Sequence, residues 1–157
     1  MTLSHVNRKN RPAMVNVSAK KITHRTARAR AIVALPRAVL AEIGKDDVRS
    51  RKGPVLQTAI VAGIMAARRT SELIPLCHPI AIEDCAIDIS LDRKNGAVIE
   101  CSVEAHHKTG VEMEALTGAA VAALTIYDMC KGVSHDIVIK DLRLIEKTGG
   151  KRDYKAR

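Results

Sequence analysis

The sequence predicts an α+β fold in which helices cover one face of an antiparallel sheet. Apolar and polar residues alternate along three segments, as in half-buried strands, and an Asn95-Gly96 turn signal joins two of these segments. Two long apolar segments, residues 54–70 and 111–131, are expected to be helices. With a further strand near the C-terminus, and with one short extra helix set aside, the order becomes the split βαβ pattern, βαββαβ.

The first strand and the short extra helix come early in the chain. Five apolar side chains between residues 27 and 35 share one parity, whereas Arg28 and Arg30 fall on the other. This period of two predicts a strand with one buried face. Pro36 then opens a short helix and Gly44 closes it, each at its preferred end.

The first long helix follows a charged loop. Pro54 stands at its first turn, and Arg68 and Arg69 stand at its last turn, where cations interact favourably with the helix dipole. Residues 71–80 contain two prolines and form the connector to the next strand.

The second half of the chain supplies the hairpin, the second long helix and the last strand. The hairpin strands are residues 85–92 and 97–105, and their alternation makes them the best-defined elements of the sequence. The last strand lies within residues 135–147, and residues 147–157 form a basic tail. Residues 1–20 are polar and irregular, and we expect them to be partly mobile.

Composition favours a protein that binds a phosphorylated small molecule. The 157 residues have the size of a single domain, and the net charge of +9 attracts anions. Two Tyr, no Phe and no Trp leave almost no aromatic surface on which single-stranded nucleic acid could stack, although binding to a duplex backbone stays open. Nucleic acid is therefore the weaker expectation for the partner.

The sequence predicts a cytoplasmic protein without a resident metal site. It shows no apolar run long enough for a bilayer and no secretory signal at its N-terminus. Its four cysteines form no C-x-x-C pair, and the adjacent Cys77 and His78 are poorly spaced for a tetrahedral ion.

The alanine-rich helix carries charges at both ends. Glu112 and Glu114 begin it, and Asp128 and Lys131 end it. A rise of 1.5 Å per residue separates Glu114 from Asp128 by about 21 Å, too far for one compact ligand. Dipole complementarity alone explains the carboxylates at the start and the lysine at the end. The small residues between them also permit another helix to pack closely. If that helix belongs to a second subunit, the two ends serve two shared sites.

Three other stretches offer candidate binding groups. His78 lies between Pro75 and Pro79 in "PLCHP", which restricts its backbone and orients it. Lys52 precedes a glycine and a helix start, a setting suited to an anion. "EKTGGK" places Lys147 and another lysine around two glycines, but it matches no P-loop spacing. For each of them an ordinary solvated loop is the alternative.

Taken together, these stretches resemble the molybdenum cofactor biosynthesis protein C family. The resemblance covers nearly the whole chain in the right order. Its matching segments are "VSAK" (17–20), "KG" (52–53), "LIPLCHP" (73–79), "KTGVEMEALT" (108–117), "VAALTIYDMCK" (121–131) and "GGK" (149–151).

The resemblance implies a ferredoxin-like fold and a homohexamer, a trimer of dimers with active sites at subunit interfaces. It also implies a lyase, cyclic pyranopterin monophosphate synthase. The enzyme converts 3′,8-cyclo-7,8-dihydroguanosine 5′-triphosphate to cyclic pyranopterin monophosphate and releases pyrophosphate. No cofactor is firmly implied, and a role for Mg²⁺ stays open.

The family motifs assign roles to particular residues. Asp128 matches the catalytic aspartate, and Lys52 and Lys131 match the essential lysines. The substrate-binding candidates and the further phosphate contacts follow from the other motifs. They are Leu76, Cys77, His78, Glu112, Met113, Glu114, Lys147, Lys20, Lys21 and Lys151.

The chain departs from the family pattern in a few places, and two other functions stay open. Asn16 and Pro54 stand where the family often has Asp, Ser71 replaces a common aromatic residue, and His135 replaces a frequent lysine. The departure at Pro54 concerns the loop geometry beside Lys52. The alternatives are a nucleic-acid-binding module of the same fold and a purely structural assembly subunit, although the latter does not explain "PLCHP".

Overall fold

The computed structural model describes residue 9 and the ranges 11–42, 49–50, 53–92 and 96–157. Lys52 and Asn95 lie outside the described residues, as does the predicted helix end at Gly44. The elements of the fold, in chain order, are β1 (Thr23–Ala34), α1 (Arg37–Ala41), β2 (Arg49–Ser50), β3 (Gly53–Pro54), α2 (Val55–Ala67), α3 (Thr70–Leu73), β4 (Asp84–Asp92), β5 (Gly96–His107), α4 (Glu112–Cys130), β6 (Val138–Thr148) and β7 (Tyr154–Lys155).

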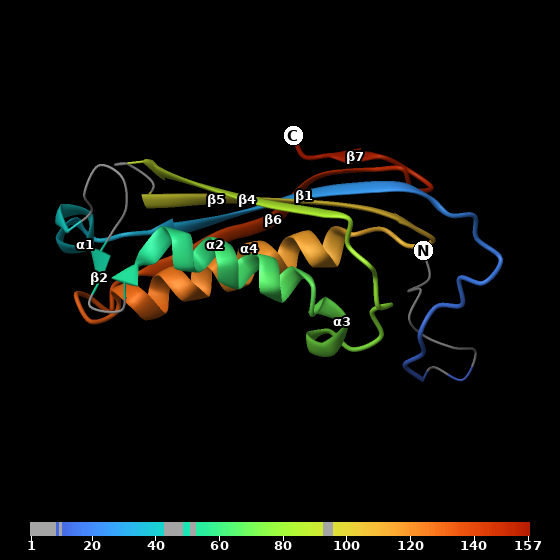
Figure 1. Cartoon of the computed structure of the whole chain (residues 1–157), viewed down its shortest axis with the longest axis horizontal. Helices are drawn as coiled ribbons and strands as arrows, with labels where there is room; N and C mark the ends of the chain where they lie inside the picture. The colour runs from blue at the N-terminus through green and yellow to red at the C-terminus, as the bar shows by residue number, and fades with distance from the viewer. Residues whose placement is uncertain (1–8, 10, 43–48, 51–52, 93–95) are drawn as a thin grey trace.

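The main sheet confirms the predicted fold class. Its strand order is β4-β5-β1-β6-β7, and each strand is antiparallel to its neighbours. The four long strands thus have the order expected of a ferredoxin-like βαββαβ arrangement, and β7 extends the sheet at one edge. The long helices α2 and α4 lie side by side on one face of the sheet (Figure 1).

Strand β1 shows why the alternating pattern specifies a two-faced sheet. Ala27, Ala29, Ala31 and Val33 are buried against the helices, whereas Arg28 and Arg30 lie on the other face. There they form ion pairs with carboxylates of the neighbouring strands. The N–O distances are 3.3 Å to Glu100 and 2.6 Å to Asp141. The arginines therefore stay charged without entering the core.

The small residues of α4 let the two long helices approach closely within one chain. A Cβ atom added to Gly63 of α2 would lie 2.8 Å from the carbonyl oxygen of Gly118 in α4. A Cβ atom added to Gly118 would lie 2.7 Å from the sulfur of Cys101 in the sheet. The alanine-rich face of α4 thus packs on α2 and the sheet, so the close helix partner that the sequence suggested belongs to the same chain.

Several local features differ from the sequence prediction. Pro54 is the extended residue that caps α2 and does not belong to its first turn. The connector contains the one-turn helix α3, and the predicted tail contains β7, which pairs with β6. The last strand covers Val138–Thr148 and thus ends one residue beyond the predicted region. Among the described residues, no helix is long and apolar enough to cross a membrane.

Candidate active site

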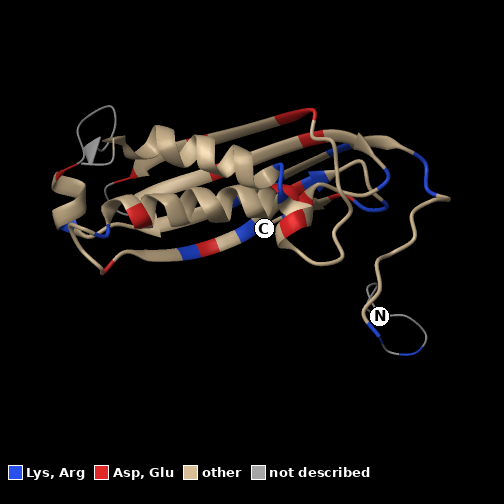
Figure 2. Cartoon of the chain, turned by 60° about the horizontal axis from the view of Figure 1, so that its bottom comes forward, with Lys and Arg blue, Asp and Glu red and all other residues tan. Residues whose placement is uncertain are grey.

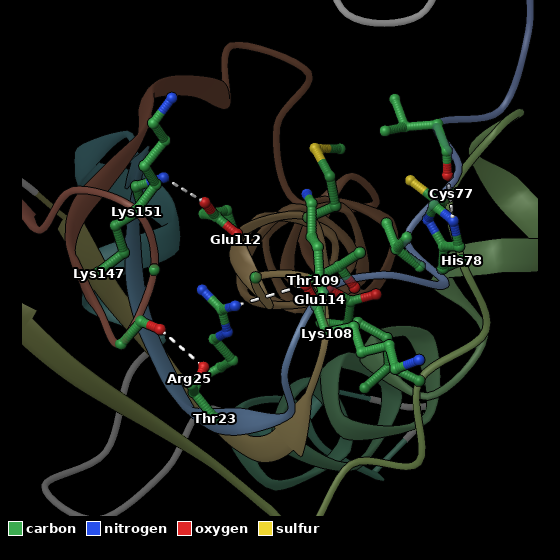
Figure 3. Close-up of a pocket in the computed structure, with 18 of the residues that line it drawn as sticks. Thr23, Arg25, Cys77, His78, Lys108, Thr109, Glu112, Glu114, Lys147 and Lys151 are labelled. Atoms are coloured by element: carbon green, nitrogen blue, oxygen red, sulfur yellow. Dashed lines mark hydrogen bonds and ion pairs between the residues drawn. The ribbon is translucent and has the colours of Figure 1, made fainter.

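A cavity of about 610 Å³ opens at the end of the sheet where α4 begins. Six segments meet there: the N-terminal segment before β1, the first residues of β1, the loop after α3, the turn after β5, the first turn of α4, and the end of β6 with its following loop. Figure 3 shows side chains from these segments facing the cavity from several sides. The fold therefore gathers residues that lie far apart in the sequence.

The cavity brings together most of the residues that the family motifs assigned to substrate. Ten predicted residues line it: Leu76, Cys77, His78, Glu112, Met113, Glu114, Lys147, Lys20, Lys21 and Lys151. Asp128 and Lys131 do not, because they lie at the opposite end of α4. The third predicted catalytic residue, Lys52, falls outside the described residues.

Cations outnumber carboxylates in the cavity. Six Lys or Arg residues and two Glu residues are among the described residues that line it. Figure 2 shows charged segments gathered near the N-terminal segment and the start of α4, whereas the helical layer is almost entirely uncharged. This excess of positive charge suits a ligand with several phosphate groups.

Lys147 and Glu112 form an ion pair across the cavity wall. The Nζ atom of Lys147 lies 2.6 Å from Oε1 of Glu112 and joins β6 to α4 (Figure 3). A Cβ atom on Gly110 would collide with the Glu112 carboxylate. The absence of a side chain at Gly110 therefore leaves the space that the carboxylate occupies.

Glu114 is a buried acid in the cavity wall. Its exposed fraction is 4%. Burial, with a smaller effect from the neighbouring Glu112 charge, raises the pKa of Glu114 to about 7. Burial, and secondly the Glu114 charge, also raises the pKa of the Cys77 thiol. Glu114 can therefore take up or release a proton near neutral pH, and Cys77 is kept as the uncharged thiol.

The loop after α3 holds His78 in a defined orientation. Leu76 adopts a left-handed backbone conformation with φ of 66°, which is unusual for a residue with a branched side chain. Nε2 of His78 lies 2.9 Å from the carbonyl oxygen of Val15. Because a carbonyl only accepts, Nε2 carries the proton and donates. The restriction predicted from "PLCHP" thus comes with a specific partner in the N-terminal segment.

Two cations of the cavity were not among the predicted site residues. Arg25 donates to two backbone carbonyls, from Nε to His107 at 3.3 Å and from Nη2 to Lys108 at 3.4 Å. Lys108 donates to the carbonyl of Ser18 at 2.9 Å. A signal for Arg25 exists in the sequence, because Arg25 falls on the parity of β1 that is apolar and buried from Ala27 onward.

The glycine loop after β6 lies directly against β1. Gly149 has φ of 77°, and a Cβ atom there would clash with the carbonyl oxygen of His24. Thr23 donates its hydroxyl to the Gly149 carbonyl at 2.8 Å, and the Gly149 amide donates to Asp153 at 3.1 Å. These contacts place Lys151 at the cavity.

The far end of α4 carries a second charged pair. Nζ of Lys131 lies 2.7 Å from Oδ1 of Asp128, and both side chains are about half exposed. The hydrogen bond to Asp128 raises the pKa of Lys131. No residue of this pair lines the cavity, as expected for helix ends separated by about 21 Å.

Comparison with known proteins gives the family of the chain. Residues 14–150 match the model of the MoaC family. The chain belongs to the MoaC family. It is 50% identical to a cyclic pyranopterin monophosphate synthase of Xanthomonas oryzae over 98% of this chain and 93% of that protein. It is 48% identical to the protein of the same name from Parvibaculum lavamentivorans, over 99% and 97% of the two chains. The resemblance inferred from the motifs is confirmed.

A longer relative contains the MoaC family sequence as one part. The molybdenum cofactor biosynthesis bifunctional protein of Synechocystis is 47% identical over 96% of this chain but only 44% of its own length.

The departure at Asn16 preserves a local hydrogen bond. Oδ1 of Asn16 accepts from the amide of Ser18 at 2.9 Å, an interaction that the aspartate frequent in the family can also make. His135 is exposed and Ser71 belongs to the short helix α3, and neither residue lines the cavity.

Proposed function

We propose that this protein is a cyclic pyranopterin monophosphate synthase. Its substrate is 3′,8-cyclo-7,8-dihydroguanosine 5′-triphosphate, and its products are cyclic pyranopterin monophosphate and pyrophosphate. The observation that carries the proposal is the cavity, which combines excess positive charge with a buried acid whose pKa is about 7. Relatives about half identical over nearly the whole chain bear the name of this activity. The chain then acts as one catalytic domain in the cytoplasm.

The triphosphate binds on the basic side of the cavity. Lys20 and Lys21 come from the N-terminal segment, and Lys147 and Lys151 come from the end of β6 and its loop. Cys77 and His78 lie on the side of the cavity opposite Lys147 and Lys151, with Glu114 between the two sides (Figure 3). The guanine-derived ring binds there, against Cys77, His78 and the further lining residues Leu76 and Met113. This arrangement places the phosphate groups against lysines and the less polar ring against apolar groups.

The complete active site is shared between subunits. Asp128 and Lys131, which match the family's catalytic positions, lie about 21 Å along α4 from the cavity of their own chain. The outer face of the helical layer is apolar and exposed, with Val61 57%, Met65 48% and Leu124 57% accessible. We infer that other copies of the chain cover such surfaces in a homohexamer, a trimer of dimers. Each cavity then receives Lys52, Asp128 and Lys131 from the protomer that supplies the other half.

The reaction uses groups from the cavity of one protomer and from the Asp128 end of α4 in another. A ribose hydroxyl attacks the α-phosphorus, a new P–O bond forms, and the bond to the bridging oxygen breaks, so that pyrophosphate leaves with the electron pair. Lysine ammonium groups stabilise the charge that develops on the leaving group. Glu114 exchanges protons during opening and rebuilding of the ring, and Asp128 keeps Lys131 protonated through their hydrogen bond. The proposal routes no step through Mg²⁺.

One experiment tests the proposal directly. The purified protein is incubated with the cyclic GTP-derived triphosphate, and pyrophosphate and the pterin product are measured together, with and without added Mg²⁺. We expect equal amounts of both products, and we expect Asp128→Ala to abolish turnover while leaving the circular dichroism spectrum unchanged. Release of pyrophosphate without the pterin, or salt-dependent binding to duplex DNA with no turnover, would contradict it.

A further inference from the structure

The N-terminal segment of residues 15–21, here called the N-terminal strap, forms one wall of the cavity. Val15, Val17, Lys20 and Lys21 all line it. Figure 1 shows the chain before β1 running beyond the end of the sheet and then turning toward the side on which the helices lie. The strap belongs to no helix and to no strand of the main sheet, so side-chain contacts determine where it lies.

Two side chains from distant parts of the chain fasten the strap. His78 donates from Nε2 to the Val15 carbonyl at 2.9 Å, and Lys108 donates from Nζ to the Ser18 carbonyl at 2.9 Å. Within the strap, the amide of Ser18 donates to Asn16, and the amide of Lys20 donates to the Val17 carbonyl at 3.0 Å. The strap is thus a short structured turn held at two points.

Lys108 is itself anchored to the sheet. Arg25 of β1 donates to the carbonyls of His107 and Lys108, and the amide of Thr109 donates to Nδ1 of His107 at 3.3 Å. A ring nitrogen that accepts is unprotonated, and burial, followed by the charges of His78, Arg25 and Lys108, lowers the pKa of His107. A continuous series of hydrogen bonds therefore links β1, through the turn after β5, to the strap.

The cations of the cavity differ in whether another group of the protein already binds them. Lys147 is paired with Glu112, and Arg25 and Lys108 donate to backbone carbonyls. Across the described ranges, the ammonium groups of Lys20, Lys21 and Lys151 have neither a hydrogen bond nor an ion pair. Two of these three uncommitted cations are on the strap.

We propose that Lys108 is a positioning residue that acts through the strap. Its ammonium group holds the Ser18 carbonyl, so that Lys20 and Lys21 face the cavity, and the affinity for a polyphosphate anion depends on Lys108 for this reason. The identity of the ligand as a polyphosphate rests on the proposed function. The fastening of the strap does not depend on the proposed function. His78 supports the same arrangement, since Nε2 is a donor in both the protonated ring and this neutral tautomer.

Hydrogen–deuterium exchange of the full chain tests the fastening without any ligand. The reporters are the hydrogen-bonded amides of Ser18 and Lys20. Lys108→Met should raise their exchange rate severalfold, and Lys108→Arg, which keeps a donor, should restore it. Exchange in β4 should stay unchanged and serves as the folding control. Lys140→Met, which removes an exposed lysine outside the cavity, should behave as wild type. Unchanged exchange in Lys108→Met would overturn the proposal.

A double-mutant cycle with inorganic pyrophosphate as the probe distinguishes positioning from direct binding. Calorimetry should show that Lys108→Met weakens pyrophosphate binding by about fivefold, a free-energy change of about 1 kcal/mol. In a chain that already carries Lys20→Met and Lys21→Met, the same substitution should have almost no effect, because the groups it positions are gone. The same fivefold loss in both backgrounds would make Lys108 a direct ligand and would overturn the proposal.

Discussion

The ammonium group of Lys147 lies 2.6 Å from the carboxylate of Glu112, and this ion pair closes one side of the basic cavity. In the absence of a ligand, the Glu112 carboxylate therefore neutralises Lys147, one of the cations of the cavity. A phosphate group that binds Lys147 must share this lysine with Glu112 or displace it. The ion pair thus affects the affinity of the cavity for anions. Substitution of Glu112 tests this effect.

Glu112→Gln should tighten the binding of inorganic pyrophosphate. The substitution removes a negative charge from the cavity and frees Lys147, and a partly exposed ion pair is worth about 1 kcal/mol or less, so we expect up to about fivefold tighter binding by calorimetry. The matched control is Asp141→Asn, which removes an ion-paired carboxylate that contacts Arg30 and does not line the cavity. Weaker binding in Glu112→Gln would show that Glu112 orients Lys147 for the anion and does not compete with it.

Glu114 should make the stability of the protein depend on pH. Its pKa of about 7 lies above the usual 4.5, so the folded protein holds the proton better than the unfolded chain does. The stabilising contribution is fully present below about pH 4.5 and is lost as the pH rises through 7, with a total of about 3 kcal/mol.

Urea denaturation at several pH values between 4.5 and 8 measures this contribution. Glu114→Gln should flatten the fall in the free energy of unfolding, because the amide does not titrate. Glu42→Gln, at an exposed carboxylate, should keep the wild-type slope. Equal slopes for wild type and Glu114→Gln would exclude a raised pKa for Glu114.

A shared active site predicts complementation between inactive variants. His78→Ala damages the cavity, and Lys131→Ala damages the far end of α4. Each alone should be inactive, but a mixture dissociated and reassembled at equal amounts should regain about a quarter of the wild-type rate, since random assembly restores that share of intact sites. A mixture of His78→Ala and Lys147→Met, both damaged in the cavity, should stay inactive. No recovery in the first mixture would place all the catalytic groups in one chain.

Gly149→Ala should destabilise the loop that carries Lys151. The position has a positive φ of 77°, and a Cβ atom would clash with the backbone carbonyl of His24, which cannot move without disturbing β1. We expect a loss of at least about 2 kcal/mol in the free energy of unfolding. Gly132→Ala is the control, because nothing lies within 4 Å of its Cβ position. A loss equal to that of the control would mean that the loop adopts another conformation in solution.

Local patterns in the sequence predicted most of the fold. Alternation placed Arg28 and Arg30 on one face of β1, and the hairpin and the two long helices followed from turn signals and apolar content. Prediction failed where long-range contacts decide the structure. β7 is a strand because it pairs with β6, and α3 is a single turn within a segment that contains two prolines. Such short elements have little intrinsic preference of their own.

The residues of the candidate site also fall into those that the sequence predicted and those that it missed. The motifs around Cys77, Glu114 and Lys147 identified three of the segments that line the cavity, because each motif is a continuous run of sequence. Arg25 and Lys108 were missed, because their roles depend on carbonyl groups that only folding brings near them.

The sequence by itself determined the fold class, the family and the excess of positive charge, since these depend on residue types and their spacing. Only the tertiary structure decided that Glu114 is buried with a pKa of about 7 and that Glu112 neutralises Lys147. Burial and charge pairing are properties of groups brought together from different segments, and a pattern along one segment does not contain them.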